Sequence, residues 1–239
     1  MQQIIGLFFK DFMGFFRSYT GYAVIFVYLS VSALLTFYGG NFFVAEDASL
    51  YAFFSVQPLI FSFIIPLLAA KAFSAEYEKG GNFEFLLTQP LKYKNILLSK
   101  AWSIFLFALF LVVLSLFPLY KFTEFAQIEP KLLVGAYCGL VLLIMVLSLL
   151  CLLTNLLITN VFAANAAATV LCITFCNTDF LWLTAVILNL CGIYSPAAEY
   201  ALSIKEGYAS FIQGEITLPV LLLFVGLTVF CWFAGYLIF

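Results

Sequence analysis

The chain contains no histidine, and charged residues make up only 9% of its 239 residues. Without imidazole it lacks the commonest general base at neutral pH and the commonest nitrogen ligand for metals. The phosphate-binding motif G-x-x-x-x-G-K-[ST] is also absent, because Gly80 and Gly81 are followed by Asn82. We therefore expect a non-catalytic chain with no cofactor and no metal, and we assign any nucleotide hydrolysis to a separate subunit.

Two remaining groups could carry chemistry, and each has a simpler explanation. Cys172 and Cys176 lie four residues apart and would share a helix face, which suits a soft metal, but two thiols without a third ligand are more simply packing residues. Glu76, Glu78 and Glu84 could serve as acid and base, yet they lie in a strongly charged segment with no cleft-forming partner.

The scarcity of charge leaves a chain that is 65% hydrophobic and 19% aromatic, with a mean hydropathy of +1.14. Soluble domains are about 45–50% apolar and about 25% charged, so the composition indicates an integral membrane protein. The net charge of −2, with no basic cluster, excludes nucleic acid as a partner. The length corresponds to a single membrane domain over residues 1–239.

Six segments are apolar enough to cross a bilayer, which takes about 20 residues of helix. We therefore predict an all-α fold with six transmembrane helices. The predicted spans are 21–38, 51–72, 101–120, 132–157, 161–176 and 217–239.

The basic residues predict the orientation. Seven of the ten lie before the first span, at the end of the second (Lys71) or between the second and third, whereas the 39–50 loop has Glu46 and Asp47 and no base. Both termini are therefore expected in the cytoplasm. We expect Lys92, Lys94 and Lys100 to face the membrane surface.

Two segments outside the spans have amphipathic patterns. Residues 1–19 predict an amphipathic helix lying on the membrane; the alternative, an early start of the first span, would bury Lys10, Asp11 and Arg17. Residues 177–216 predict an external segment with a re-entrant or interfacial helix over 180–193. A second interfacial helix follows, beginning at Ser195-Pro196 and ending at Gly214.

Polar and small residues within the spans suggest helix packing. The amides are expected to form hydrogen bonds between helices, and the alanines to form a close-packing surface, with a subunit interface or translocation path as the alternative. Pro58 and Pro66 are expected to kink the second span. Asp179 is compatible with a simple interfacial position or a functional one. The amides and alanines are Gln57, Asn155, Asn160, Asn165, Asn189, Ala163, Ala164, Ala167 and Ala168.

Residues 73–100 form a predicted cytoplasmic coupling loop. The stretch 74–95 holds six charged residues, whose burial in the bilayer would cost on the order of 15–20 kcal/mol. Asn82 is a good N-cap, Phe83–Leu87 predict a short apolar helix, and Pro90 ends it. Such a helix is suited to dock into another protein, and a solvated loop at the lipid surface is the alternative.

This loop resembles that of the ABC-2 type permeases, and within them the gliding-motility-type subgroup. Asn82 stands where the family has threonine, and both residues cap helices. Ser18, Gly21, Tyr22 and Pro66 are similar to the family as well, although Tyr19 stands where a proline is common. The loop residues that match are Ala75, Glu76, Glu78, Lys79, Gly81, Glu84, Leu86, Leu87, Thr88 and Pro90.

The resemblance implies an N-terminal elbow helix and a coupling helix that binds a separate ABC ATPase subunit. It also implies a second permease copy or paralogue in the complex. The expected partners are that ATPase, the second permease, the lipid bilayer and a protein with a large external domain. The expected ATPase contact consists of Glu76, Glu78, Gly81, Asn82, Phe83, Glu84, Leu86, Leu87 and Pro90.

The sequence therefore predicts a permease subunit of an ATP-driven exporter or mechanotransmission complex in a bacterial inner membrane. Two other functions stay open. One is a membrane-embedded enzyme that modifies lipid or peptide, which without histidine would have to use Asp179, Glu199 or cysteines. The other is a structural membrane anchor of a complex.

Overall fold

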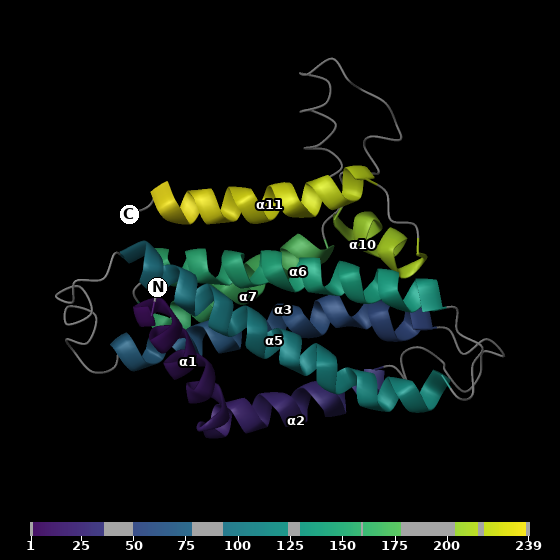
Figure 1. Ribbon diagram of the computed structural model, residues 1–239, viewed down its shortest axis with the longest axis horizontal. Coiled ribbons are helices and arrows are strands. Elements are labelled where there is room, and N and C mark those ends of the chain that lie inside the picture. The colour runs from purple at the N-terminus through teal and green to yellow at the C-terminus, as the bar shows by residue number, and fades with distance from the viewer. Residues whose placement is uncertain are drawn as a thin grey trace, which may run out of the picture.

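The computed structural model describes residues 2–35, 50–77, 93–123, 130–158, 160–177, 204–214 and 218–237. Over these residues the chain is entirely helical (Figure 1). The helices are α1 (Gln2–Phe16), α2 (Tyr19–Leu34), α3 (Leu50–Tyr77), α5 (Tyr93–Thr123), α6 (Pro130–Leu157), α7 (Val161–Asn177), α10 (Ile204–Ile212) and α11 (Leu218–Leu237).

Within the described residues, three helices are long and apolar enough to cross a membrane. Their apolar parts, Phe53–Phe73, Leu98–Leu116 and Leu132–Leu157, match the second, third and fourth predicted spans. The predicted all-helical membrane protein is confirmed at this level. The other three predicted spans coincide with the shorter apolar helices Tyr19–Leu34, Val161–Asn177 and Val220–Gly235.

The long helices lie side by side and alternate in direction along the chain (Figure 1). The start of α1, the end of α3, the start of α5 and the end of α11 all lie at one end of the bundle, on the left of the view. We call this end the junction end. The end of α2, the start of α3, the end of α7 and the helix α10 lie at the other end, which we call the far end.

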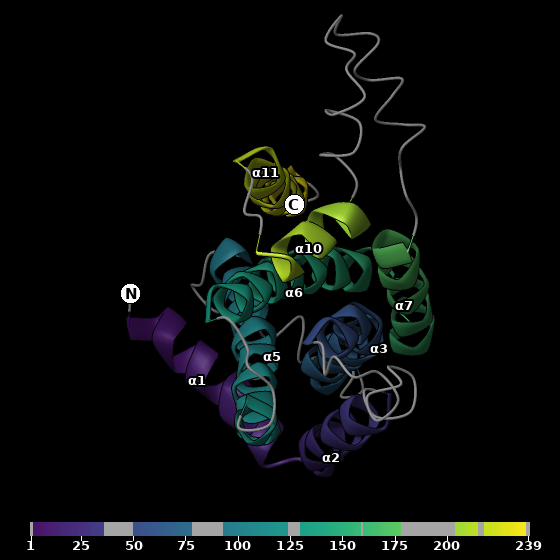
Figure 2. The ribbon, with the colours of Figure 1, turned by 90° about the vertical axis from the view of Figure 1, so that its right-hand side faces the viewer.

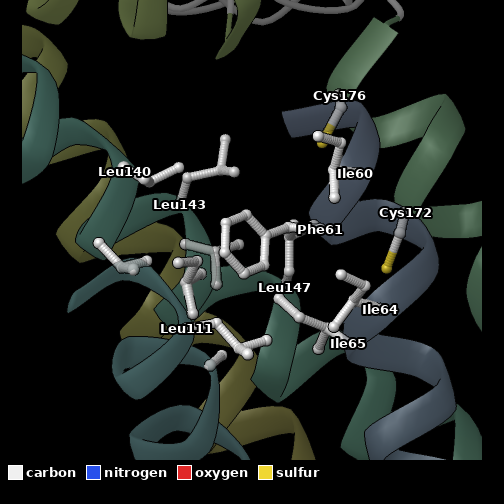
Figure 3. Close-up of a cluster of buried hydrophobic side chains, with 14 of the residues drawn as sticks. Ile60, Phe61, Ile64, Ile65, Leu111, Leu140, Leu143, Leu147, Cys172 and Cys176 are labelled. Atoms are coloured by element: carbon white, nitrogen blue, oxygen red, sulfur yellow. The ribbon is translucent and has the colours of Figure 1, made fainter. Parts of the chain in front are cut away.

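Helix α3 runs through the middle of the bundle, surrounded by α2, α5, α6 and α7 (Figure 2). Its Phe61 is completely buried and points toward Leu143 and Leu147 of α6 (Figure 3). Residues on the outer surface, such as Phe63 and Leu67 of the same helix, are large, apolar and exposed. An apolar interior and an apolar exterior together are typical of a helix bundle in lipid.

Helix α7 packs through a stripe of small residues. Ala164, Ala168, Cys172 and Cys176 recur every fourth position and are all buried, whereas Ala163 is exposed. Small side chains at this spacing allow backbones to approach closely, which is how helices associate where lipid removes most of the hydrophobic driving force. The stripe lies against α3 and α6.

The proline Pro58 lies inside the continuous helix α3 and leaves one backbone carbonyl to be satisfied from outside. Proline has no N–H, so the Phe54 carbonyl four residues earlier lacks its usual helical donor. The Tyr208 hydroxyl of α10 donates a hydrogen bond to that oxygen at 3.0 Å. The proline thus creates the acceptor to which α10 is attached.

The amides within the spans form hydrogen bonds of different kinds. Gln57 accepts a hydrogen bond from the buried Tyr28 hydroxyl of α2 at 3.2 Å, which links α2 to α3. Asn155 instead donates to the Cys151 carbonyl of its own helix, and Asn160 caps the start of α7 by accepting from the Phe162 N–H. Asn189 lies outside the described residues.

Helices α1 and α2 are separated by a sharp elbow. The Ser18 hydroxyl caps α2 by accepting from the Gly21 N–H at 3.2 Å, and it donates to the Phe15 carbonyl at 2.9 Å. A Cβ at Gly21 would collide with that same carbonyl oxygen, so the elbow requires glycine there. Phe15 of α1 is buried against Phe107 of α5 at 4.9 Å between ring centroids.

Helix α10 sits in a notch formed by two glycines of α6. A Cβ at Gly139 would lie 2.6 Å from the Cβ of Phe211, and one at Gly135 would lie 2.8 Å from its carbonyl oxygen. Gly214 follows the helix with a φ of 76°, as expected for a helix that ends in a left-handed residue. The predicted end of this helix at Gly214 agrees, whereas the predicted start at Ser195-Pro196, the 180–193 helix and Asp179 lie outside the described residues.

The notch leads to a testable prediction. Gly139→Ala should lower the free energy of unfolding by about 1–3 kcal/mol, because the clash involves Phe211 atoms next to the backbone, which cannot rotate away. Gly226→Ala in α11 is the matched control, since nothing lies within 4 Å of a Cβ there. Thermal unfolding in detergent measures both, and equal stability of the two variants would contradict the notch.

Candidate functional site

The residues predicted to contact an ATPase lie mostly outside the described part of the chain. Glu76 is in the last turn of α3, one residue before its end at Tyr77. Residues 78–92 connect α3 to α5, and both of these helix ends lie at the junction end of the bundle (Figure 1). The predicted contacts in that connection, outside the described residues, are Glu78, Gly81, Asn82, Phe83, Glu84, Leu86, Leu87 and Pro90.

A buried lysine joins the two helices that flank this connection. The Lys100 ammonium of α5 donates a hydrogen bond to the Ala72 carbonyl of α3 at 2.7 Å, and it lies 4.8 Å from the centroid of the Phe73 ring. Lys100 and Phe73 are each only 2% exposed. The expectation that Lys100 faces the membrane surface is therefore wrong: it points into the bundle, where the carbonyl and the ring replace water around its charge.

The buried Lys100 ammonium is stabilised only where suitable partners surround it. A buried ammonium has a high desolvation cost unless hydrogen bonds or opposite charge compensate for it. A carbonyl near the carboxyl end of a helix is a favourable partner, because the helix dipole is negative there. The face of an aromatic ring also attracts a cation. Lys100 thus holds the start of α5 to the end of α3 at a defined point.

Helix α1 brings a carboxylate toward the same place. Burial raises the pKa of the Asp11 carboxyl above its ordinary value of 3.8, while the positive charges of Lys100 and Lys10 partly oppose that shift. Its Oδ2 has no hydrogen-bond partner among the described residues. We call Asp11, Ala72, Phe73 and Lys100 the Lys100 junction, because they bring three helices together.

The outer surface of α1 is divided lengthwise. Phe9 and Met13 are exposed apolar side chains, and Lys10 and Arg17 are exposed charged ones. A helix that packs one face on protein and divides its other face between apolar and charged residues is suited to the boundary between lipid and water. Tyr19, at the start of α2, is 96% exposed.

The thiols do not form a metal centre in the described residues, where no three Cys, Asp or Glu side chains gather. The Cys172 thiol lies 3.3 Å from that of Cys151 on α6, so its nearest sulfur comes from a neighbouring helix. Both thiols are buried. Their position on the α6–α7 interface agrees with a packing role.

Sequence reasoning missed the Lys100 junction, although the sequence held a sign of it. Lys100 is followed directly by the apolar run of the third span, and helical spacing places Ile96 and Ile104, both buried, on its own face. A lysine that lies between two apolar residues on the same helix face is expected to be buried with them. The hydrogen bond of Lys100 to the Ala72 carbonyl involves the backbone, which no residue pattern could reveal.

Comparison with known protein families finds no family model that matches the chain, and comparison with curated proteins finds no match.

The Asp11 environment predicts a dependence of stability on pH. Above pH 3.8 the folded chain retains a proton on Asp11 that the unfolded chain has lost, so the free energy of unfolding decreases as pH rises through this window. Asp11→Asn should remove this slope and stabilise the chain at neutral pH. Unfolding measured from pH 4 to 7 tests this, with Glu206→Gln at the far end as control; an unchanged slope in Asp11→Asn would count against it.

Proposed function

We propose that the chain is the membrane subunit of an ATP-driven exporter or mechanotransmission complex of the ABC-2 type. It couples ATP hydrolysis on a separate subunit to movement of its own helices, and it performs no hydrolysis itself. The observation that carries the proposal is the Lys100 junction, which ties α3 to α5 beside the charged connection 78–92.

The argument is mechanical. An ATPase that pushes on residues 78–92 would act on the ends of α3 and α5. Because Lys100 joins these ends, the two helices would move together, and α3 lies against α2, α6, α7 and α10. Displacing one central helix would therefore shift the packing of the whole bundle, since close-packed interiors transmit strain.

In the proposed topology, the chain crosses the membrane six times and both termini lie in the cytoplasm of a bacterial cell. The exposed Lys10 is next to Asp11 of the Lys100 junction, which supports placing that end inside. The start of α1 and the end of α11 both lie at that end of the bundle (Figure 1), as an even number of crossings requires. The proposed partners are an ABC ATPase at this end, a second permease, and a protein with a large external domain at the far end.

Charge reversal in the connection tests the ATPase contact. Glu84→Lys should leave folding and membrane insertion intact and reduce the ATP hydrolysis of the complex purified through a tag on this chain, because a carboxylate in the contact becomes a cation. Glu206→Lys, the same change at the far end, is the matched control. If both variants co-purify and hydrolyse ATP like the unchanged chain, the contact is not there.

Replacement of the buried lysine tests transmission separately from contact. Lys100→Met keeps the length of the side chain but removes the charged hydrogen bond to Ala72, worth about 1.5–3 kcal/mol. The complex should still assemble, and its ATP hydrolysis should fall, since α3 and α5 no longer move together. Arg17→Met, which replaces an exposed cation just after α1, is the control. Full ATP hydrolysis in a Lys100→Met complex of reduced thermal stability would show that the junction is only structural.

A further inference from the structure

A cluster of polar side chains lies inside the bundle, toward its far end. The buried Tyr28 hydroxyl of α2 donates a hydrogen bond to Gln57 of α3. The Ser115 hydroxyl of α5 lies 3.5 Å from the Tyr137 hydroxyl of α6, and Ser115 also interacts with Tyr28. Four helices thus each contribute one neutral polar side chain to the same place, which we call the Gln57 cluster.

The cluster lies within the apolar part of the spans. Gln57 is four residues beyond Phe53, where the apolar part of α3 begins, and Tyr137 is five residues beyond Leu132, where that of α6 begins. At 1.5 Å per residue, these positions are about 6–8 Å inside the far end. Polar groups at this depth have no bulk water to bond to, so each of them needs a partner inside the bundle.

Gln57 has one hydrogen-bonding group without a partner. Its side chain is 0% exposed, and its Oε1 accepts the hydrogen bond from Tyr28. Its Nε2 has no acceptor in the described part of the chain. A buried polar group without a partner loses its bonds to water and gains nothing in return, which is strongly destabilising. The amide therefore favours a ligand that can accept a hydrogen bond.

The contacts that join the helices in this cluster are long. Hydrogen bonds from a hydroxyl to an oxygen are most often about 2.7–2.8 Å in proteins. The bond from Tyr28 to Gln57 is 3.2 Å, and the Ser115–Tyr137 contact is 3.5 Å. Ser115 bonds to the Val112 carbonyl of its own helix at only 2.6 Å. The packing of the helices thus holds their polar groups apart, and these groups keep most of their capacity to bond to a further molecule.

Space that water can occupy lies next to the cluster. Val56 and Pro58, on either side of Gln57 in the sequence, line a cavity of about 550 Å³, and so does Tyr208 of α10. Tyr208 is buried close to Tyr28. The cavity therefore reaches the residues that surround the cluster, and a molecule as small as water has only a short path between them.

We propose that the Gln57 cluster binds an internal water molecule, which accepts a hydrogen bond from Gln57 Nε2 and donates to the hydroxyl oxygens of Tyr28 and Tyr137. Buried waters typically make about three hydrogen bonds to groups that the protein leaves unsatisfied. An apolar ligand would leave the amide unpaired, and a charged one would meet no opposite charge, since the side chains of the cluster are neutral. The site requires only the folded chain, so it holds or fails independently of the proposed coupling function.

X-ray footprinting of the purified full-length chain in nanodiscs tests the site. Brief irradiation produces hydroxyl radicals from water, bound water included, and mass spectrometry locates the side chains that they oxidise. Tyr28 is the reporter, because it is 0% exposed and bulk water does not reach it. Phe61 and Phe107 are equally buried aromatic controls outside the cluster. After correction for intrinsic reactivity, Tyr28 should be oxidised well above both controls; oxidation no higher than theirs overturns the proposal.

A matched pair of variants tests the role of the amide. Gln57→Leu removes the group that binds the water and should lower the oxidation of Tyr28 to the level of Phe61. Asn155→Leu is the control, since Asn155 is also buried but donates to the Cys151 carbonyl of its own helix. It should leave the oxidation of Tyr28 unchanged.

The same pair distinguishes bound water from transient opening of the bundle. Oxidation that came from opening would be as high in Gln57→Leu as in the unchanged chain, and that result overturns the assignment to Gln57. The oxidation of Phe61 reports whether each variant is folded. If Gln57→Leu does not fold, the measurement of Tyr28 against Phe61 in the unchanged chain still decides the proposal.

Discussion

The central helix α3 is packed against other helices, although lipid would solvate its apolar surface almost as well as those helices do. Burial alone gives little reason for such helices to associate, so specific contacts must do it. Two kinds are present: the small-residue stripe of α7, which allows close approach, and hydrogen bonds that reach α3 from α2, α5 and α10. The position of α3 among α2, α5, α7 and α10 depends on these contacts.

The helical class and the three long spans could be predicted because hydrocarbon thickness fixes how long an apolar helix must be. Helix ends were harder to predict: α2 begins at Tyr19, two residues before the predicted start of the first span. Contacts between helices were mostly beyond prediction. The amides Gln57 and Asn155 look alike in the sequence, but Gln57 bonds to a neighbouring helix and Asn155 to a carbonyl of its own.

The same limit applies to the candidate site. Charge density identified the connection 78–92, because charges are excluded from lipid. It could not distinguish a lysine that faces headgroups from one that faces inward, since Lys100 precedes an apolar run in either case. Lys100 faces inward because its ammonium bonds to the Ala72 carbonyl, 28 positions earlier in the chain. The two groups are close only once α3 and α5 are packed together.

Pro58 shows how a local defect can specify a distant arrangement. Substitution by alanine would restore an N–H for the Phe54 carbonyl, and the helix itself would then compete with Tyr208 for that oxygen. A stronger α3 would therefore mean a weaker attachment of α10, and the far end of the bundle would loosen while its centre tightened. Pro58 thus lowers the stability of α3 as a helix and, at the same time, leaves the Phe54 carbonyl available to fix the position of α10.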